Sequence, residues 1–227
     1  MEDELNVKRL EKGIFIVLEG IDGSGKTTQA SRLADSFVLS GIDAVMTREP
    51  TDGQWGRRIR EIAKNGRDGV SLQDELEIFL KDREEHVKEF IQPALDEGRV
   101  VVCDRYYYST MAYQGALGLD PAEIRRLNED VNKFPKPDLV IMIEIEPWQG
   151  ISRIEKDRAG GANAGYERDD FLKKVKAIFD SMPDGNIRRT PGMGCQRAIA
   201  KQISDIVKES LGFDLSKSGF TDLSCAD

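Results

Sequence analysis

Residues 14–29 read IFIVLEGIDGSGKTTQ, and they contain the clearest structural signal in the chain. The first five, 14–18, are β-branched or bulky apolar residues, which is typical of a buried strand. Gly20, Gly23 and Gly25 then predict an irregular loop, because glycine adopts backbone conformations that other residues avoid. An amphipathic run follows the loop, so a helix is predicted near 27–40.

The loop matches the pattern G-x-x-x-x-G-K-[ST] between Gly20 and Thr27. In this pattern backbone N–H groups form a nest for phosphate oxygens, and the N-terminus of the next helix adds its dipole. Lys26 is the catalytic candidate that follows charge onto the β- and γ-phosphates, and Thr27 offers a hydroxyl to Mg²⁺. A chance glycine-rich turn is the alternative, but the strand before and the helix after favour a site for ATP or GTP. The residues predicted to bind this nucleotide are Gly20, Ile21, Asp22, Gly23, Ser24, Gly25, Lys26, Thr27 and Thr28.

The chain has 227 residues, of which 39% are hydrophobic, so it is long enough for one α/β domain with a sizeable core. Its net charge is −8, from 33 basic and 41 acidic residues. An acidic surface argues against binding along a nucleic-acid backbone, which needs a basic face. A small anionic substrate held by a few arginines is compatible with this charge.

The sequence shows no sign of export or of a membrane anchor. Its start, MEDELNVKRLEKG, lacks the apolar core of a signal peptide, and no run reaches the ~18 apolar residues of a membrane span. Cys103, Cys195 and Cys225 are odd in number and lack metal-site spacing, which predicts free thiols in a reducing cytoplasm. His86 is the only histidine, so histidine-based catalysis is not expected.

Apolar strand-like runs alternate with amphipathic helical segments along the chain. Strands are predicted at 14–18, 44–46, 100–103 and 139–145, and helices at 27–40, 56–64, 72–97, 121–132 and 147–157. This alternation predicts an α/β fold with three layers, in which a parallel sheet is flanked by helices on both faces. Ligands of such sheets bind at the carboxyl ends of the strands.

Residues 1–211 are expected to form a single domain, because no repeat or low-complexity linker interrupts them. A lid is predicted at about 153–168, where charged helical residues flank the small, flexible stretch AGGANAG. Residues 183–195 are rich in turn formers and are expected to be irregular. The end, 212–227, lacks periodicity and is expected to be a frayed, disordered tail.

A charged pair, Asp104-Arg105, ends the strand that begins at Val100. In the predicted architecture both side chains lie beside the phosphate loop. An acid there can organise Mg²⁺ or orient a nucleophile, so Asp104 is a candidate metal ligand and catalytic residue. A guanidinium matches phosphate oxygens two at a time, so Arg105 is a candidate ligand for an acceptor phosphate. The alternative is a surface salt bridge, which the neighbouring phosphate loop disfavours.

Four stretches, in this order, resemble the thymidylate (dTMP) kinase family: the phosphate loop, TREPT at 47–51, IFLKDREEH at 78–86 and DRYYYSTMAYQG at 104–115. The resemblance covers about Gly13 to Ser181. It implies the P-loop NTPase fold with a five-stranded parallel sheet, and transfer of the γ-phosphoryl group of ATP to dTMP. It also implies Mg²⁺ as cofactor and a homodimer.

The resemblance also implies the residues of the acceptor site. A phenylalanine that stacks on thymine and an arginine that contacts the base match Phe79 and Arg83, which share one helix face at i and i+4. Phe79 has an alternative role in the core, because Leu76 and Leu80 lie near the same stripe. His86, one turn after Arg83, is expected to be structural. The further positions matched to the acceptor site are Arg48, Glu49, Arg60, Arg105, Ser109, Thr110 and Gln114.

The lid is expected to supply positive charge to the transferring phosphoryl group. Some family members carry an arginine in the phosphate loop, but here Gly23 follows Asp22, and the other members place the arginine in the lid. Arg153 and Arg158 are therefore the catalytic candidates, and Arg158 is nearer the glycine stretch. Solvated helix residues paired with nearby acids are the alternative.

Tyr166-Glu167 resembles a Tyr-Glu pair that follows the lid in members of the first group. There the tyrosine crowds the 2′ position of the sugar, so the resemblance implies that Tyr166 contacts the acceptor and favours deoxyribose. The chain thus combines features of both groups.

Two other functions remain open from the sequence. A kinase for dUMP, UMP or a small anionic metabolite would need a similar pocket, and one methyl group on the base contributes only ~1–3 kcal/mol to discrimination. A nucleotide-binding switch would need no arginine-rich acceptor pocket, yet Arg48, Arg60, Arg83 and Arg105 fall where one would form. The enzyme interpretation is therefore preferred.

Overall fold

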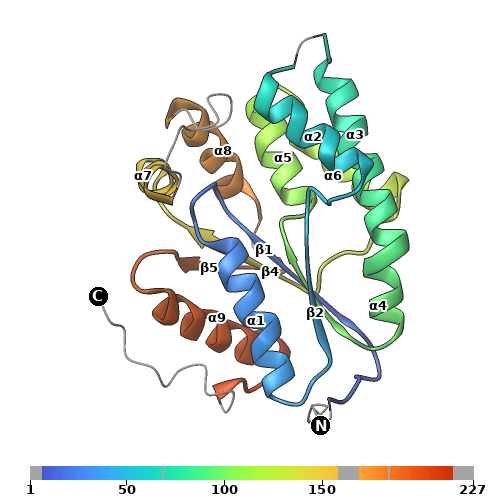
Figure 1. The fold of residues 1–227 in the computed structure, drawn as a ribbon, viewed down its shortest axis with the longest axis vertical. Helices are drawn as coiled ribbons and strands as arrows, with labels where there is room; N and C mark the ends of the chain where they lie inside the picture. Colours follow the sequence, from blue (N-terminus) through green and yellow to red (C-terminus); the bar gives the residue numbers. More distant parts are fainter. Residues whose placement is uncertain (1–6, 68, 158–168, 184, 217–227) are drawn as a thin grey trace.

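Five parallel strands form the centre of the molecule (Figure 1). The structure, a computed structural model, describes residues 7–67, 69–157, 169–183 and 185–216. The strands lie in the order β2-β3-β1-β4-β5. Their bounds are β1 Ile14–Glu19, β2 Ala44–Arg48, β3 Val100–Asp104, β4 Leu139–Glu144 and β5 Ile187–Pro191.

Helices connect the strands. Their bounds are α1 Lys26–Leu39, α2 Gln54–Asn65, α3 Leu72–His86, α4 Gln92–Asp96, α5 Tyr107–Ala116, α6 Pro121–Arg126, α7 Pro147–Asp157, α8 Asp169–Ser181 and α9 Gln196–Leu211. Two π-helical turns, η1 Val87–Ile91 and η2 Leu127–Val131, continue α3 and α6. The predicted helical segments 72–97 and 121–132 therefore each correspond to an α-helix extended by such a turn.

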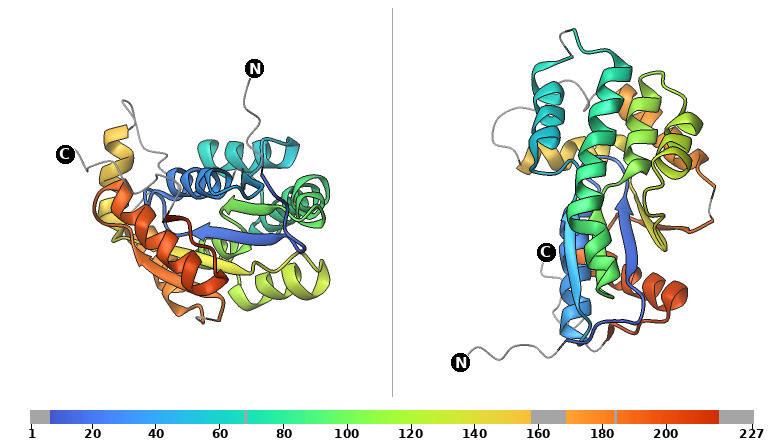
Figure 2. Two further views of the ribbon diagram at one scale, coloured as in Figure 1. Left: turned by 90° about the horizontal axis from the view of Figure 1, so that it is seen from below. Right: turned by 90° about the vertical axis from the view of Figure 1, so that its right-hand side faces the viewer.

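Alternate residues of the strands build two hydrophobic cores, one on each face of the sheet. In β1, Phe15 and Val17 belong to one core and Ile16 and Leu18 to the other, because successive side chains of a strand point in opposite directions. Helices α3, α5 and α8 cover the first face, and α1 and α9 cover the second, so the helices pack on both sides of the sheet (Figure 2). Burial on both faces explains why the strands read as continuous apolar runs. The predicted three-layer α/β fold with a five-stranded parallel sheet is confirmed.

The register of the central strands brings their carboxyl ends together. β1 pairs with β3 so that Leu18 lies opposite Asp104, and β2 pairs with β3 so that Arg48 lies opposite the same residue. β4 pairs along the other side of β1. The segments that follow β1, β2 and β3 therefore meet at one edge of the sheet, where ligands of this architecture bind.

The fifth strand lies inside a segment that the residue pattern predicts as irregular. The prediction for 183–195 is wrong for 187–191, which form β5. β5 pairs only with β4 at the edge of the sheet, and its buried side chains are Ile187 and Thr190. The arginines between them and Pro191 hide the apolar pattern that marks the inner strands. Only the family resemblance implied a fifth strand.

The segment after α9 packs against the second core as far as it is described. The ring of Phe213 meets Phe37 edge-on at 5.5 Å between centroids, and Leu215 is buried. The prediction of a frayed tail from residue 212 is therefore wrong for 213–216. The rest of that tail, 217–227, lies outside the described residues.

The cysteines differ in their state. Cys103 is a buried free thiol in β3, whereas Cys195 is disulfide-bonded. The prediction of free thiols is therefore wrong for Cys195, and Cys225 lies outside the described residues. Within the described part of the chain, every helix is too short or too polar to cross a membrane.

Candidate active site

The phosphate-loop pattern forms the turn between β1 and α1. Gly20 and Gly23 have φ angles of 142° and 77°, in the region that favours glycine, and a Cβ on either would lie 2.4 Å from a carbonyl oxygen. Gly25, at φ 93°, precedes the first residue of α1, and a Cβ built on it would meet nothing within 4 Å. The tight packing of the first two glycines and the open space beside the third fit a loop that leaves room for phosphate.

Lys26 folds back over this loop. Its Nζ donates to the carbonyl of Ile21 at 2.8 Å, and the side chain is buried. Burial, and then the positive charge of Arg105, lower the pKa of Lys26 to about 8. An anion beside Nζ would offset both causes, so a bound polyphosphate would stabilise the charged form of Lys26.

Thr27 and Asp104 join the start of α1 to the end of β3. The Thr27 hydroxyl donates to Oδ2 of Asp104 at 2.5 Å. Oδ1 of Asp104 is buried and has no hydrogen-bond partner within the described residues. Hard oxygen ligands of this kind suit Mg²⁺, so the pair fits the predicted metal site. The described residues hold no group of three or more His, Cys, Asp or Glu that could bind a metal alone, so phosphate oxygens and water would complete the coordination.

Arg105 connects the phosphate loop to α5. Its Nη2 pairs with Oδ1 of Asp22 at 2.5 Å, and its Nη1 donates to the hydroxyl of Ser109 at 2.9 Å. Its backbone has a φ of 71°, which turns the chain at the end of β3. Burial lowers the pKa of Arg105, but the neighbouring Asp22 and Tyr113 outweigh it, so the net shift is upward. Arg105 is therefore a permanently charged group at the wall of the loop.

Glu19, which the sequence analysis missed, holds the start of α5. It is fully buried at the end of β1, where Oε1 accepts from the backbone N–H groups of Tyr106 at 2.8 Å and Ser109 at 3.1 Å. Oε2 accepts from the Ser109 hydroxyl at 2.6 Å. The carboxylate thus occupies the positive end of the helix, although burial raises its pKa. The signal that could have identified Glu19 from the sequence is a glutamate at the end of an otherwise apolar strand.

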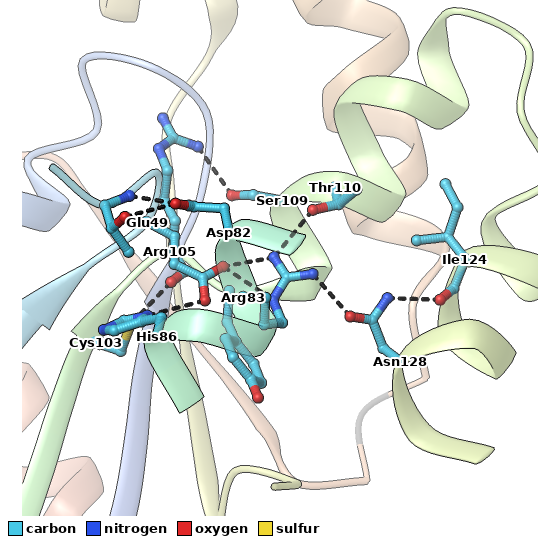
Figure 3. Close-up of polar contacts among 12 residues, drawn as sticks. Glu49, Asp82, Arg83, His86, Cys103, Arg105, Ser109, Thr110, Ile124 and Asn128 are labelled. Atoms are coloured by element: carbon cyan, nitrogen blue, oxygen red, sulfur yellow. Dashed lines mark hydrogen bonds and ion pairs between the residues drawn. The ribbon is translucent and has the colours of Figure 1, made fainter. Parts of the chain in front are cut away.

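Arg83 lies at the centre of a buried polar cluster (Figure 3). Its Nε and Nη2 donate to Oε2 of Glu49 at 2.9 and 2.5 Å. Its Nη1 donates to Asn128 at 2.7 Å, and Nη2 also donates to Thr110 at 3.2 Å. Asn128, from η2, was not identified from the sequence. Four N–H groups of Arg83 are engaged here and a guanidinium has five, so one Nη1–H is left for a ligand.

Both members of the central ion pair carry their charge. Burial raises the pKa of Glu49, but Arg83 and His86 outweigh it, so the net shift is downward. Burial lowers the pKa of Arg83, but Glu49 outweighs it, so the net shift is upward. The ring of Tyr106 lies 4.9 Å from the Arg83 guanidinium carbon and adds a cation–π contact. Arg83 therefore acts as a donor only.

Phe79 lies on α3 one turn before Arg83. Leu76 and Leu80 of the same helix pack in the first hydrophobic core, but Phe79 is only partly buried and belongs to neither core. The interpretation of Phe79 as a plain core residue is therefore not supported. Its partial exposure leaves ring surface free for contact with a planar ligand.

Gln114 presents an unused acceptor. The side chain is buried, and its Nε2 lies 3.4 Å from Oε1 of Glu75. Its Oε1 is buried without a hydrogen-bond partner in the described part of the chain. A buried acceptor left unpaired costs free energy, so a ligand donor at this position would be favourable.

Arg48 and Arg60 are arranged differently from the other predicted acceptor residues. Arg48 Nη2 pairs with Asp52 at 2.8 Å and Arg60 Nη2 pairs with the same carboxylate at 3.1 Å. Arg60 also donates to the carbonyl of Pro50 at 3.0 Å. Arg48 is the last residue of β2 and Arg60 lies on α2. Both side chains and the carboxylate of Asp52 are exposed, and solvent weakens ion pairs between exposed groups.

Arg153 reaches the phosphate loop from α7. Its Nη1 donates to the carbonyl of Gly23 at 3.2 Å, and its Nη2 donates to that of Gly192 at 2.8 Å. The alternative of a solvated helix residue is therefore wrong for Arg153. The remaining lid predictions, Arg158 and Tyr166, lie outside the described residues.

A cavity of about 520 Å³ opens over the phosphate loop. The loop from Asp22 to Thr28 lines it together with Arg105, Arg153 and Lys156. The volume is that of a small-molecule site, and the cationic lining suits a polyphosphate. A phosphate loop with an arginine-lined anion site beside it defines a P-loop nucleotide-binding protein of the phosphotransferase class.

The comparisons with known proteins specify the family. The family model described as thymidylate kinase matches residues 18–191, and the chain belongs to this family. A thymidylate kinase of Desulfotalea psychrophila (strain LSv54 / DSM 12343) is 40% identical over 200 residues, which are 86% of this chain and 96% of the relative. One of Xanthomonas campestris pv. campestris (strain B100) is 41% identical over 170 residues, or 75% and 72% of the two chains. One of Xanthomonas euvesicatoria pv. vesicatoria (strain 85-10) is 36% identical over 210 residues, or 92% and 90%.

Proposed function

We propose that the protein transfers the γ-phosphoryl group of ATP to dTMP, giving ADP and dTDP. Membership of the thymidylate kinase family supports this reaction. The observation that carries it is the ion pair of Arg105 with Asp22 of the phosphate loop at 2.5 Å. This contact sets an anion-binding arginine of the acceptor side directly against the donor site, as in-line transfer between two phosphates requires.

On the donor side, the N–H groups of the loop and the N-terminus of α1 bind the phosphates of ATP. Lys26 leaves its contact with the Ile21 carbonyl and follows the charge on the β- and γ-phosphates. Thr27 and Asp104 would hold Mg²⁺, for which the unpaired Oδ1 of Asp104 is the supporting observation. The ion, when bound, supplies positive charge to the phosphate oxygens of ATP.

On the acceptor side, Arg105 holds the phosphate of dTMP and Phe79 stacks on its thymine ring. Arg83 has one N–H to offer, which suits the O4 carbonyl of thymine. The unpaired Oε1 of Gln114 is an acceptor and suits the N3–H of the same base. Cytosine presents the reverse pattern, an amino group and a bare ring nitrogen, so this pair of side chains favours dTMP over dCMP.

Arg153 is the transition-state arginine that we propose from the described residues. Its hydrogen bond to the Gly23 carbonyl already anchors it at the phosphate loop. A guanidinium in this position stabilises negative charge that develops on the transferring group. The lid at about 153–168, with Arg158 and Tyr166, is proposed to close over the site and exclude water.

The test is ADP production from ATP and Mg²⁺ with dTMP, dUMP, UMP, dCMP, AMP or no acceptor. The proposal expects dTMP to stimulate turnover most and dCMP least among the pyrimidines. Equal turnover with no acceptor would instead indicate an ATPase, and the same turnover with dCMP as with dTMP would contradict the assigned roles of Arg83 and Gln114.

Three coarser features complete the proposal. Residues 1–211 form one domain. The protein is a homodimer, as the family resemblance implies, and sedimentation velocity measures this oligomeric state directly. The cytoplasm is the proposed compartment, since it supplies both nucleotides. The disulfide at Cys195 is the observation that does not support this last assignment.

A further inference from the structure

His86, the only histidine of the chain, has partners on both ring nitrogens. It is the last residue of α3 and is buried. Its Nε2 lies 2.6 Å from the hydroxyl of Thr47 on β2. Its Nδ1 lies 3.1 Å from Oε1 of Glu49 (Figure 3). The ring of Phe90 stacks against it at 6.0 Å between centroids, with 29° between the planes. The imidazole is thus held on both edges and on one face.

The chemistry of these partners defines the proton positions on the ring. Arg83 and His86 hold the pKa of Glu49 below its ordinary value, so Glu49 is a carboxylate that can only accept. The facing nitrogen, Nδ1, must therefore carry a proton. In the neutral ring Nε2 is then an acceptor, and the Thr47 hydroxyl donates to it.

The two oxygens of Glu49 are divided between His86 and Arg83. Oε1 faces His86, and Oε2 alone accepts from both Nε and Nη2 of Arg83. A free carboxylate beside a guanidinium prefers to use both oxygens, each accepting one N–H. The contact with His86 prevents this rotation. It therefore sets the plane of Glu49, and through it the direction of the Arg83 guanidinium.

We propose that His86 is a positioning residue for the acceptor nucleotide, because it fixes Glu49 in the orientation that aims the remaining N–H of Arg83 at the base. This inference rests on the proposed function, in which Arg83 contacts thymine. It replaces the sequence-based view of His86 as a structural residue. A change at His86 is expected to affect binding of the acceptor and not of ATP. The reason is that its partners Thr47, Glu49 and Phe90 lie outside the phosphate loop.

Three substitutions separate the two edges of the ring. In His86→Asn the amide nitrogen falls near the position of Nδ1 and keeps a donor for Glu49. In His86→Gln the amide reaches the position of Nε2 and keeps only the contact with Thr47. His86→Leu keeps neither contact but retains the apolar packing.

The expected result is a KM effect on one substrate only. His86→Leu and His86→Gln should raise the KM for dTMP about tenfold, the typical loss of a hydrogen bond to a charged group, with the KM for ATP changed less than about twofold. The preference for dTMP over dCMP in kcat/KM should fall by a similar factor. His86→Asn should restore both quantities towards those of the wild-type protein. A merely structural role would lower thermal stability in all three variants without this split between substrates.

A second measurement does not depend on the variants folding. Because His86 is the only histidine, its ring ¹⁵N signals in the full-length protein are assigned without ambiguity. The Nδ1–H form is expected without nucleotide, and dTMP should shift these signals while ATP alone should not. An Nε2–H form, or a ring that ignores dTMP, overturns the inference.

The two levels of the proposal fail in different ways. A wild-type protein that phosphorylates dTMP, with folded His86→Leu and His86→Gln variants that keep its KM, overturns the role of His86 alone. A wild-type protein in which dTMP stimulates no turnover removes the proposed function, and the inference with it, whatever the state of the ring.

Discussion

The ammonium group of Lys26 gives a sharp test of the donor site. Burial, together with the charge of Arg105, lowers its pKa from the ordinary 10.5 to about 8 in the nucleotide-free protein. The triphosphate of ATP brings negative charge to Nζ and is expected to raise this pKa again. Binding of ATP near and above pH 8 must therefore take up a proton.

The size of the effect follows from one protonation equilibrium. If only the ammonium form binds ATP well, the apparent Kd rises by the factor 1 + 10^(pH − pKa). With a pKa of about 8, the Kd should be about eightfold higher at pH 9 than at pH 7.5. At pH 9 binding should take up about 0.9 proton per site. The range begins at pH 7.5 because phosphate groups with a pKa of about 6 are then fully ionised.

Isothermal titration calorimetry with ATP and Mg²⁺ measures both quantities. Titrations at each pH in two buffers with different heats of ionisation give the number of protons taken up. Lys26→Arg should lose the pH dependence, because guanidinium stays protonated. Lys156→Met is the matched control, because Lys156 lines the same cavity, and it should keep the dependence. An unchanged Kd between pH 7.5 and 9, or no proton uptake in the wild-type protein, would refute the reasoning.

Three further predictions concern single side chains. Glu19→Ala should lower the free energy of unfolding by about 2–3 kcal/mol, because two backbone N–H groups at the start of α5 lose their acceptor. Glu19→Gln should lower it by less than half as much, and urea unfolding of the two variants measures the difference. Phe79→Ala should raise the KM for dTMP, leave the affinity for ATP unchanged and lower the free energy of unfolding by less than about 1 kcal/mol. Leu76→Ala in the core should lower the free energy of unfolding by about 2–5 kcal/mol, and an equal loss in Phe79→Ala would show that Phe79 is a core residue. Arg153→Ala should lower kcat roughly 10²-fold or more with little change in the KM for dTMP, as steady-state kinetics would show. If ATP binding alone became weaker, Arg153 would stabilise the phosphate loop and have no role in the transition state.

The phosphate loop illustrates what contiguous residues can specify. The positions of its glycines and of Lys26 are set by neighbours in the sequence, and a glycine with positive φ needs no distant partner to be recognised. The alternation of apolar runs with amphipathic segments was equally readable, because both faces of a parallel sheet are buried. The edge strand β5 was not, because only Ile187 and Thr190 of its residues are buried.

The cluster around Arg83 illustrates the opposite case. Glu49, Arg83 and Asn128 are far apart in the sequence and come from the end of β2, α3 and η2. Their charges could equally have lain in solvent, because burial of an ion pair depends on what packs around it. The resemblance to the family marked two of these residues, but it did not show that Arg83 retains a single N–H for a ligand.

The sequence by itself determined the phosphate loop and the parallel α/β architecture, because these depend on local spacing and periodicity. The candidate acceptor arginines Arg48, Arg60 and Arg83 came from the resemblance of short stretches to the family. Only the tertiary structure decided which of those groups are buried and paired. Glu19 became the anchor of α5 and His86 the partner of Glu49 because β1, β2 and α3 end at the same edge of the sheet. Hydrogen bonds between such segments depend on the register of strands and helices, which no single stretch of the chain contains.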